Sequence, residues 1–423
     1  MLQYDINNAN LCYNIKDMSK IRFVDGGVCA PKGFKAAGVA AAIKYEGRND
    51  VALVAADVPC VSAAVFTTNK VAAAPVLHDR AKNAFGKAQA IVANSGCANA
   101  CTGEQGLKDA DTTALAAAGE LGIDPKLVLV ASTGVIGRPL PMERLLSGVK
   151  KAVAALGRSP AHALAATRAI MTTDTKPKQA AVKTAIGGKT VTVGAMSKGS
   201  GMIEPNMATM LGFVTTDAAI SRAMLAKALR SALAKSFNRL VVDGDESTND
   251  SLFVLASGKA GNPVITKQGP DYEAFLSALE AVAVSLARQM AADGEGATKF
   301  VTVKVKGART AKDANLAARA IAKSPLAKTS WFGKDPNWGR VLAAAGYSGA
   351  DVDPVKASVF YGSEWAYRRG TVADAAQLKR LEKVLEKNEF TVTVDLALGK
   401  GECEIYTCDF SLDYVHINAD YTT

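Results

Sequence analysis

Apolar residues recur along this chain in two periods, and clusters of glycine and small polar residues interrupt both. Alternation of apolar and polar positions over 180–185 and 189–195, on either side of Gly187-Gly188, predicts a β-hairpin. Apolar positions spaced three and four apart over 272–292 predict a long amphipathic helix. The same two patterns predict the remaining strands at 36–43, 51–56, 88–93, 127–130, 211–216, 240–243, 252–255, 301–305, 390–396, 403–408 and 414–418, and helices at 105–120, 142–156, 311–322, 375–385 and after a cap at Asp217 or Ser221.

The order of these elements predicts the fold class. Strands and helices follow one another without strict alternation, which favours layered sheets covered by helices over a doubly wound sheet. The fold class is therefore α/β in the broad sense that includes α+β. The polar opening as far as Met18 is expected to be a poorly ordered arm.

Two successive segments share one local order, a strand followed by small polar residues and then a helix. Asn94-Ser95-Gly96 follows the strand at 88–93, and Ser132-Thr133-Gly134 follows the strand at 127–130. Backbone N–H groups in such loops can hold an anion or an oxyanion. Since threonine also caps helices, capping by Thr133 is an alternative that is compatible with oxyanion donation.

Composition and charge exclude several classes of protein. Of 423 residues, 49% are hydrophobic and only 6% aromatic, so the core is built mainly from Ala, Val, Leu and Ile. The net charge is +10, but basic and acidic residues are interleaved, unlike the clustered charge of a nucleic-acid surface. We therefore expect a cytoplasmic protein without a nucleic-acid or membrane partner. Its net positive charge is expected to attract small anions.

The cysteines and histidines do not have the spacing of metal ligands. Seven cysteines form an odd count, and the three histidines stand far apart, so we expect reduced thiols and no metal site. Cys97 and Cys101 are expected to be small buried residues, because no base stands beside them.

The segment 199–213 has the character of a constrained loop that presents a nucleophile, Thr209. Glycines at 199, 201 and 212 permit a strained backbone around it. A threonine can use its own α-amine as the base once the preceding peptide bond is cut, and the pKa of an α-amine is about 7.7–8.0. The hypothesis is self-cleavage between Ala208 and Thr209, with Thr133 and Gly134 as oxyanion donors.

Six motifs together resemble one known family. Ala208-Thr209-Met210-Leu211, preceded by Glu204-Pro205-Asn206-Met207, resembles the cleavage site of the ornithine acetyltransferase family of arginine biosynthesis. The other five motifs, which are long and occur in the family's order, span 94–103, 132–137, 171–175, 293–299 and 335–340. The resemblance extends over essentially the whole chain.

This resemblance implies a self-processing enzyme with an α-β-β-α sandwich, cut into 1–208 and 209–423. It would transfer the acetyl group of N-acetyl-L-ornithine to L-glutamate by a ping-pong route, with Thr209 as nucleophile and no cofactor. Acetyl-CoA remains open as a second acetyl donor. Two copies of each cut chain would form a heterotetramer. The residues that the resemblance assigns to substrate binding are Thr173, Lys198, Thr209, Glu295, Asn418 and Thr423.

Two positions depart from the family pattern, and two other functions stay open. Cys97 stands where the family more often has Asn, and Cys29 where it commonly has Thr. Neither is a catalytic position.

The alternative functions are a self-processing aminopeptidase or amidohydrolase, in which water replaces glutamate, and a non-catalytic binding protein. Asn249 and Asp250 are expected to stabilise their loop more than to catalyse, and Trp338 to be structural.

Overall fold

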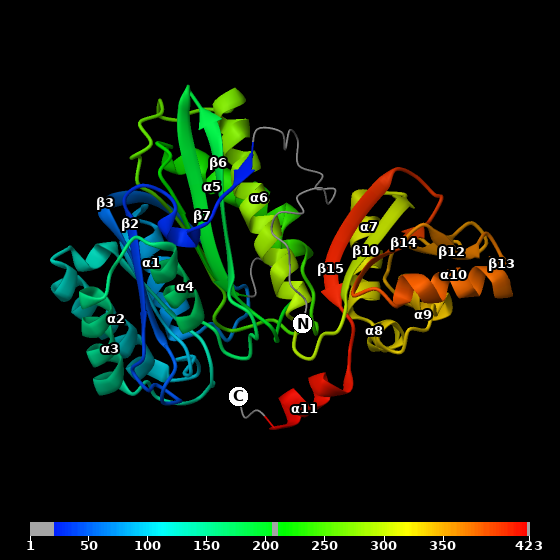
Figure 1. Ribbon diagram of the computed structural model, residues 1–423, viewed down its shortest axis with the longest axis horizontal. Helices are drawn as coiled ribbons and strands as arrows, with labels where there is room; N and C mark the ends of the chain where they lie inside the picture. The colour runs from blue at the N-terminus through cyan, green and yellow to red at the C-terminus, as the bar shows by residue number, and fades with distance from the viewer. Residues whose placement is uncertain (1–20, 205–209, 421–423) are drawn as a thin grey trace.

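Two β-sheets with helices packed on them make up the structure, a computed structural model in which residues 21–204 and 210–420 are described (Figure 1). The opening arm to Met18, the cleavage residues Ala208 and Thr209, and Thr423 lie outside the described residues.

The first sheet has nine strands in the order β1-β6-β7-β8-β9-β3-β4-β5, with β2 paired to β3. Antiparallel pairs dominate it, but β8 runs parallel to β9 and β4 parallel to β5. Its strands are β1 (Arg22–Phe23), β2 (Phe34–Val39), β3 (Val51–Phe66), β4 (Lys87–Asn94), β5 (Val128–Ser132), β6 (Lys178–Ile186), β7 (Lys189–Lys198), β8 (Leu211–Thr216) and β9 (Ser251–Ala256).

The long strand β3 belongs to two layers. Its first half pairs with β2 and its second half with β9, and its register with β4 shifts between Ala55 and Cys60. Val54 of the first half packs in one buried cluster with Phe213 of β8, so the two halves of the sheet face each other across an apolar core. The strand predicted at 51–56 is therefore only the first part of β3, which continues through residues 57–66.

Helices cover the outer faces of both layers, which gives the α-β-β-α order. The helices of this part are α1 (Ala74–Asn83), α2 (Gly103–Leu121), α3 (Met142–Ala154), α4 (Pro160–Ala169), α5 (Arg222–Lys235) and α6 (Pro270–Ala292). One buried cluster joins α2 and α3 to β2–β5, and another joins α5 and α6 to β6–β9 (Figure 1). Residues of α4 lie in the core between the layers. The expected mixed α/β sandwich is confirmed.

The second sheet has six strands in the order β13-β12-β11-β14-β10-β15. Val301, Val303 and Val305 alternate along β10 and pack in one cluster with α7, α8 and α9. The elements are β10 (Phe300–Ala308), β11 (Ser358–Tyr361), β12 (Glu364–Arg368), β13 (Thr371–Val372), β14 (Glu389–Asp395), β15 (Gly401–Cys408), α7 (Ala311–Lys323), α8 (Pro325–Phe332), α9 (Trp338–Gly346), α10 (Ala375–Leu385) and α11 (Leu412–Asp420). Trp338 stacks on Tyr367 with ring centroids 4.4 Å apart, as expected for a structural residue.

Helix α6 lies between the two sheets, and Phe300 and Tyr406 of the second sheet share its apolar cluster. Among the described residues, α6 is the one helix long and apolar enough to cross a membrane by length and composition, but 67% of its most apolar window is buried in the protein. Its sequence pattern is therefore explained by its position in the core.

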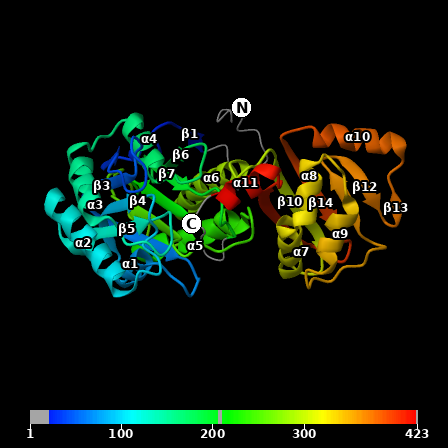
Figure 2. The same ribbon diagram turned by 90° about the horizontal axis from the view of Figure 1, so that it is seen from below.

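Two predicted strands are wrong. Residues 240–243 make one isolated bridge, Leu240 to Tyr406, and connect the two sheets instead of joining either. Residues 414–418 lie in helix α11, which returns from β15 toward the first sheet (Figure 2). The Ser411 hydroxyl accepts a hydrogen bond from the Asp413 N–H at 3.1 Å at the start of this helix. This local cap outweighs the strand preference of Tyr414, Val415 and Ile417.

Candidate active site

The loop after β5 carries Thr133 and Gly134, and neighbouring backbone holds it in place. The Thr133 N–H donates to the Asn94 carbonyl at 3.0 Å, so the two small-residue loops predicted from the sequence lie side by side. Asn249 fastens both loops, because its side-chain amide donates to the carbonyls of Ala98 at 2.6 Å and Ser132 at 2.8 Å. Asn249 therefore stabilises the site, as the sequence predicts.

Gly134 has a backbone that only glycine fits. Its φ is +130°, and a Cβ atom there would lie 2.4 Å from the carbonyl carbon of Gly96. Of the residues that the structure describes, none accepts a hydrogen bond from the Gly134 N–H. An N–H group held in this way is a donor that a ligand oxygen can use.

Lys198, the last residue of β7, points its ammonium group at Thr133. Its Nζ donates to the Thr133 Oγ1 at 3.1 Å. Burial lowers the pKa of Lys198 below its ordinary value, while the nearby carboxylate of Asp174 acts in the opposite direction. Lys198 therefore contacts the site and is not a solvated surface lysine.

Glu295 lies in the turn after α6 and is buried. Its carboxylate accepts a hydrogen bond from the Asn418 side chain at 2.8 Å, and its backbone N–H donates to the Ser200 carbonyl at 2.9 Å. A Cβ atom on Gly201 would lie 2.3 Å from the same carboxylate, so a glycine at 201 allows its backbone to approach Glu295 closely. Helix α11 thus reaches the site through Asn418.

One cavity brings the sequence-predicted residues together. It encloses about 640 Å³, part of it open to solvent. Six of the predicted residues line it, namely Thr133, Gly134, Thr173, Lys198, Glu295 and Asn418. The other two substrate-binding residues, Thr209 and Thr423, lie outside the described residues, as does Ala208.

The described chain on either side of the predicted cleavage site is fixed by one loop, 242–251. Asp243 accepts hydrogen bonds from the N–H groups of Met202 at 2.6 Å and Ile203 at 2.8 Å. Downstream, the Met210 carbonyl accepts from the Ser251 N–H at 2.9 Å. Loop 242–251 therefore contacts the chain both before and after the residues where cleavage is expected.

Asp250 in that loop is a buried carboxyl group that sequence reasoning did not place in the site. Its Oδ2 atom has no hydrogen-bond partner among the described residues. Burial raises its pKa well above the ordinary value, which favours the neutral carboxyl group.

Sequence reasoning also missed a buried ion network behind the cavity. The Lys178 ammonium group lies 2.6 Å from Asp174 Oδ1 and 2.5 Å from Asp293 Oδ2. Asp174 also accepts from the Gly199 N–H at 2.7 Å, and Asp293 accepts from Thr175. The network joins three loops of the site. The sequence did contain a signal for this network, because Asp174 and Asp293 stand inside the motifs at 171–175 and 293–299.

The described cysteines are all free thiols, but one expectation about them is wrong. Cys97 is buried, and its Sγ donates to the Arg138 carbonyl at 3.2 Å, whereas Cys101 is exposed. Cys101 lies in the turn before α2, with a positive φ of +57°, and this turn projects its side chain outward. Among the described residues, no group of three or more His, Cys, Asp and Glu side chains is arranged to hold a metal ion.

A cavity with an ammonium group, a carboxylate and several hydroxyl groups on its wall defines a protein that binds small polar molecules. The model of the ArgJ family matches residues 35–423 of this chain. The chain belongs to the ArgJ family.

Individual relatives agree with this assignment over nearly their full lengths. The arginine biosynthesis bifunctional protein ArgJ of Symbiobacterium thermophilum is 54% identical over 407 residues, 95% of this chain and 100% of its own. Its namesake in Geobacter sulfurreducens is 52% identical over 392 residues, 93% of this chain and 99% of its own. A crystal structure of ornithine acetyltransferase complexed with ornithine, from Mycobacterium tuberculosis, is 44% identical, with a TM-score of 0.42 over 44% of this chain and 100% of that one. The family model and the two relatives from Symbiobacterium and Geobacter confirm the family named from the motifs.

Proposed function

We propose that this chain is an acyltransferase of arginine biosynthesis that moves the acetyl group of N-acetyl-L-ornithine to L-glutamate. One observation carries the proposal. Thr133, Gly134, Thr173, Lys198, Glu295 and Asn418, which come from distant parts of the sequence, line a single cavity. Membership of the ArgJ family and the names of the relatives support the same pathway.

In the first half of the reaction, the hydroxyl oxygen of Thr209 attacks the acetyl carbonyl carbon of N-acetylornithine. The α-amine of Thr209 takes the hydroxyl proton. The Thr133 hydroxyl and the Gly134 N–H donate to the oxyanion, the C–N bond breaks, and ornithine leaves with the proton. The product on the protein is an acetyl ester of Thr209.

In the second half, the neutral amino group of glutamate attacks the ester carbonyl and the C–O bond to Thr209 breaks. The proton of the attacking amine passes through the Thr209 α-amine to the Thr209 oxygen, and N-acetylglutamate leaves. The charges of the cavity fit the α-carboxylate that both amino acids carry and the side-chain ammonium group of N-acetylornithine. In this proposal Lys198, which donates to Thr133, pairs with the α-carboxylate, and Glu295, which accepts from Asn418, holds the ammonium group. Because the same cavity receives donor and acceptor in turn, no second amino-acid site is needed.

The same nucleophile would first cut its own chain. Thr209 attacks the Ala208 carbonyl, the peptide nitrogen leaves as the α-amine, and water opens the resulting ester. The products are chains 1–208 and 209–423. We propose that two copies of each form a heterotetramer in the cytoplasm, without a nucleic-acid or membrane partner, a metal or a bound cofactor, and that Thr423 closes the cavity.

The competing function is a self-processing aminopeptidase or amidohydrolase, in which water accepts the acyl group. We expect the purified protein to form N-acetylglutamate and ornithine in equal amounts from N-acetylornithine and glutamate, with little free acetate. Chromatography of all three products checks this. Acetate formed at the same rate with and without glutamate would establish the hydrolase instead, and absence of any turnover would favour a binding protein.

The variant Thr133→Val tests the oxyanion role. Valine keeps the shape of the side chain but removes the hydroxyl group, so we expect kcat to fall about 10²–10³-fold. KM for N-acetylornithine should change much less, because the lost contact forms mainly in the transition state. Thr112→Ala, on the exposed face of α2, is the control. An unchanged kcat in Thr133→Val would remove Thr133 from the mechanism.

A further inference from the structure

The segment 199–204, here called the cleavage arm, leads to the predicted cut. Its backbone is fixed by loop 242–251, because Asp243 accepts the two hydrogen bonds already described. The Glu204 N–H adds a third bond, to the Asp245 carbonyl at 2.9 Å. Glu204 is the last residue that the structure describes before the predicted cut.

The side chain of Glu204 pairs with helix α7, which covers the second sheet. One carboxylate oxygen lies 2.5 Å from the Lys323 ammonium nitrogen, and the other lies 3.5 Å from a guanidinium nitrogen of Arg319. The two cations stand four residues apart on α7, so they face the same carboxylate. Arg319 is itself held, because it donates to the Asn238 carbonyl at 2.6 Å. The Glu204 side chain is only 12% exposed.

The backbone around this ion pair is closely packed. Gly244 has a φ of +92°, and a Cβ atom there would lie 3.1 Å from Cε of Lys323 and 3.7 Å from Oε2 of Glu204. In the arm itself, Met202 has a φ of +55°, which is uncommon for a residue with a side chain. Such a conformation persists only where the surroundings impose it. The contacts of the arm therefore hold it in a conformation that its sequence does not favour.

We propose that Glu204 is a positioning residue for the self-cleavage and acts through its ion pairs with Lys323 and Arg319. The inference rests on the proposed function, which includes the cut between Ala208 and Thr209. An ion pair that is largely withdrawn from water interacts more strongly than a fully exposed one. Glu204 is four residues away from the bond that breaks and takes no part in the bond making.

Five residues, 205–209, separate Glu204 from the next fixed point of the chain. That point is Met210, whose carbonyl accepts a hydrogen bond from the Ser251 N–H at 2.9 Å. Anchoring both ends of a short segment limits the space that it explores, and confinement of the reacting groups speeds an intramolecular attack. After the cut, residues 205–208 and the nucleophile belong to different chains. The ion pairs should therefore speed the cleavage but not the acetyl transfer.

The test follows cleavage of freshly synthesised protein over time by denaturing electrophoresis. In Glu204→Gln and in Lys323→Met, we expect the rate of cleavage to fall about tenfold or more. The double variant should be cut no more slowly than Glu204→Gln, because both changes remove the same contact. Once cut, each variant should transfer acetyl groups with a kcat per cut chain within about twofold of the wild type.

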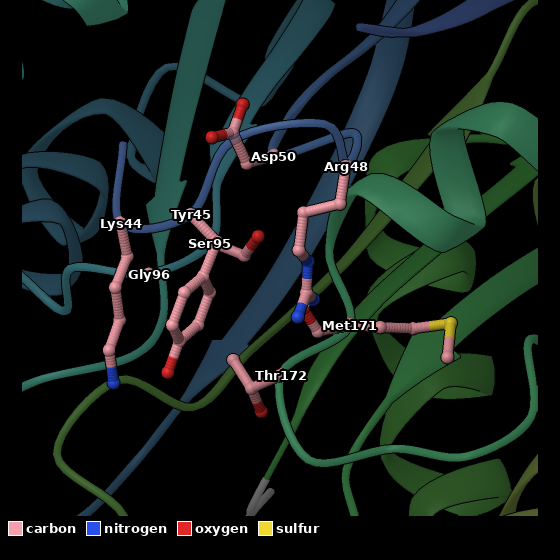
Figure 3. Close-up of a pocket in the computed structure, with 8 residues that line it drawn as sticks. All are labelled: Lys44, Tyr45, Arg48, Asp50, Ser95, Gly96, Met171 and Thr172. Atoms are coloured by element: carbon pink, nitrogen blue, oxygen red, sulfur yellow. The ribbon is translucent and has the colours of Figure 1, made fainter. Parts of the chain in front are cut away.

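Two variants serve as matched controls, and both should be cut at the rate of the wild type. Glu404→Gln breaks an ion pair with Lys304 on the second sheet, which is also partly exposed and 3.6 Å long. Lys44→Met removes a lysine from the wall of a smaller hollow (Figure 3), which shares Thr172 with the cavity. The first controls for loss of any ion pair, and the second for loss of a positive charge close to the site.

Cleavage of Glu204→Gln at the rate of the wild type would overturn the assignment. An equal fall in cleavage and in kcat per cut chain would also overturn it, because a role in general stability lowers both. In either case the proposed function would stand. A wild type that stays uncut would instead refute the self-cleavage on which the inference rests.

Discussion

Thr209→Ala is expected to leave the chain uncut and without acetyl transfer. Alanine has no hydroxyl group to attack either the Ala208 carbonyl or the acetyl group, so both reactions lose their nucleophile. We expect activity to fall by at least about 10⁴-fold, as when other nucleophiles are removed. Denaturing electrophoresis of freshly made protein checks the cut, and formation of N-acetylglutamate checks the transfer.

The conservative variant separates loss of chemistry from loss of structure. Thr209→Ser keeps a hydroxyl group and an α-amine, so we expect it to retain part of both the cleavage and the transfer activity. Thr112→Ala serves as a control for threonine removal in general. A Thr209→Ala chain that is fully cut would contradict the mechanism, since cleavage would then need another nucleophile.

The sequence predicted most elements of the fold because their patterns are local. The hairpin around Gly187-Gly188 appears as β6 and β7, and the helix predicted at 272–292 is α6. The patterns could not show that β3 runs on as far as Phe66, because exposed Asp57 and Pro59 interrupt its apolar run where the register with β4 shifts. Helix α11 was missed because none of its residues is buried, so it has no apolar stripe.

The candidate site could be predicted as a set of residues but not as an arrangement. The motifs contained Thr133, Lys198 and Glu295, and the structure adds what lies between them. The sequence predicted that Asn249 stabilises its loop but not which groups it holds, because a side-chain amide that holds two distant carbonyls has the same sequence signal as any loop asparagine. Likewise, Lys178 begins a strand like many surface lysines, and only the fold shows that it is buried.

Lys178→Met is the variant with the largest expected effect on stability. Lys178 is buried between Asp174 and Asp293, so removing its charge leaves two buried carboxylates without their cation. We expect a loss of about 3–5 kcal/mol in the free energy of unfolding. Urea unfolding followed by circular dichroism measures it. Lys306→Met, which removes a partly exposed ion pair with Asp395, is the control and should cost only about 0–1 kcal/mol.

Acid should weaken the same network in the wild type. Lys178 and Lys198 counteract burial and hold the pKa of Asp174 below its ordinary value. An aspartate in the unfolded chain has a pKa of about 3.9, so the stability that Asp174 contributes is complete above that pH and is lost as the pH falls below it. We expect the wild type to lose stability in this acid range, whereas Lys178→Met should be destabilised already at neutral pH. A Lys178→Met chain as stable at neutral pH as the Lys306→Met control would show that the network does not hold the three loops of the site together.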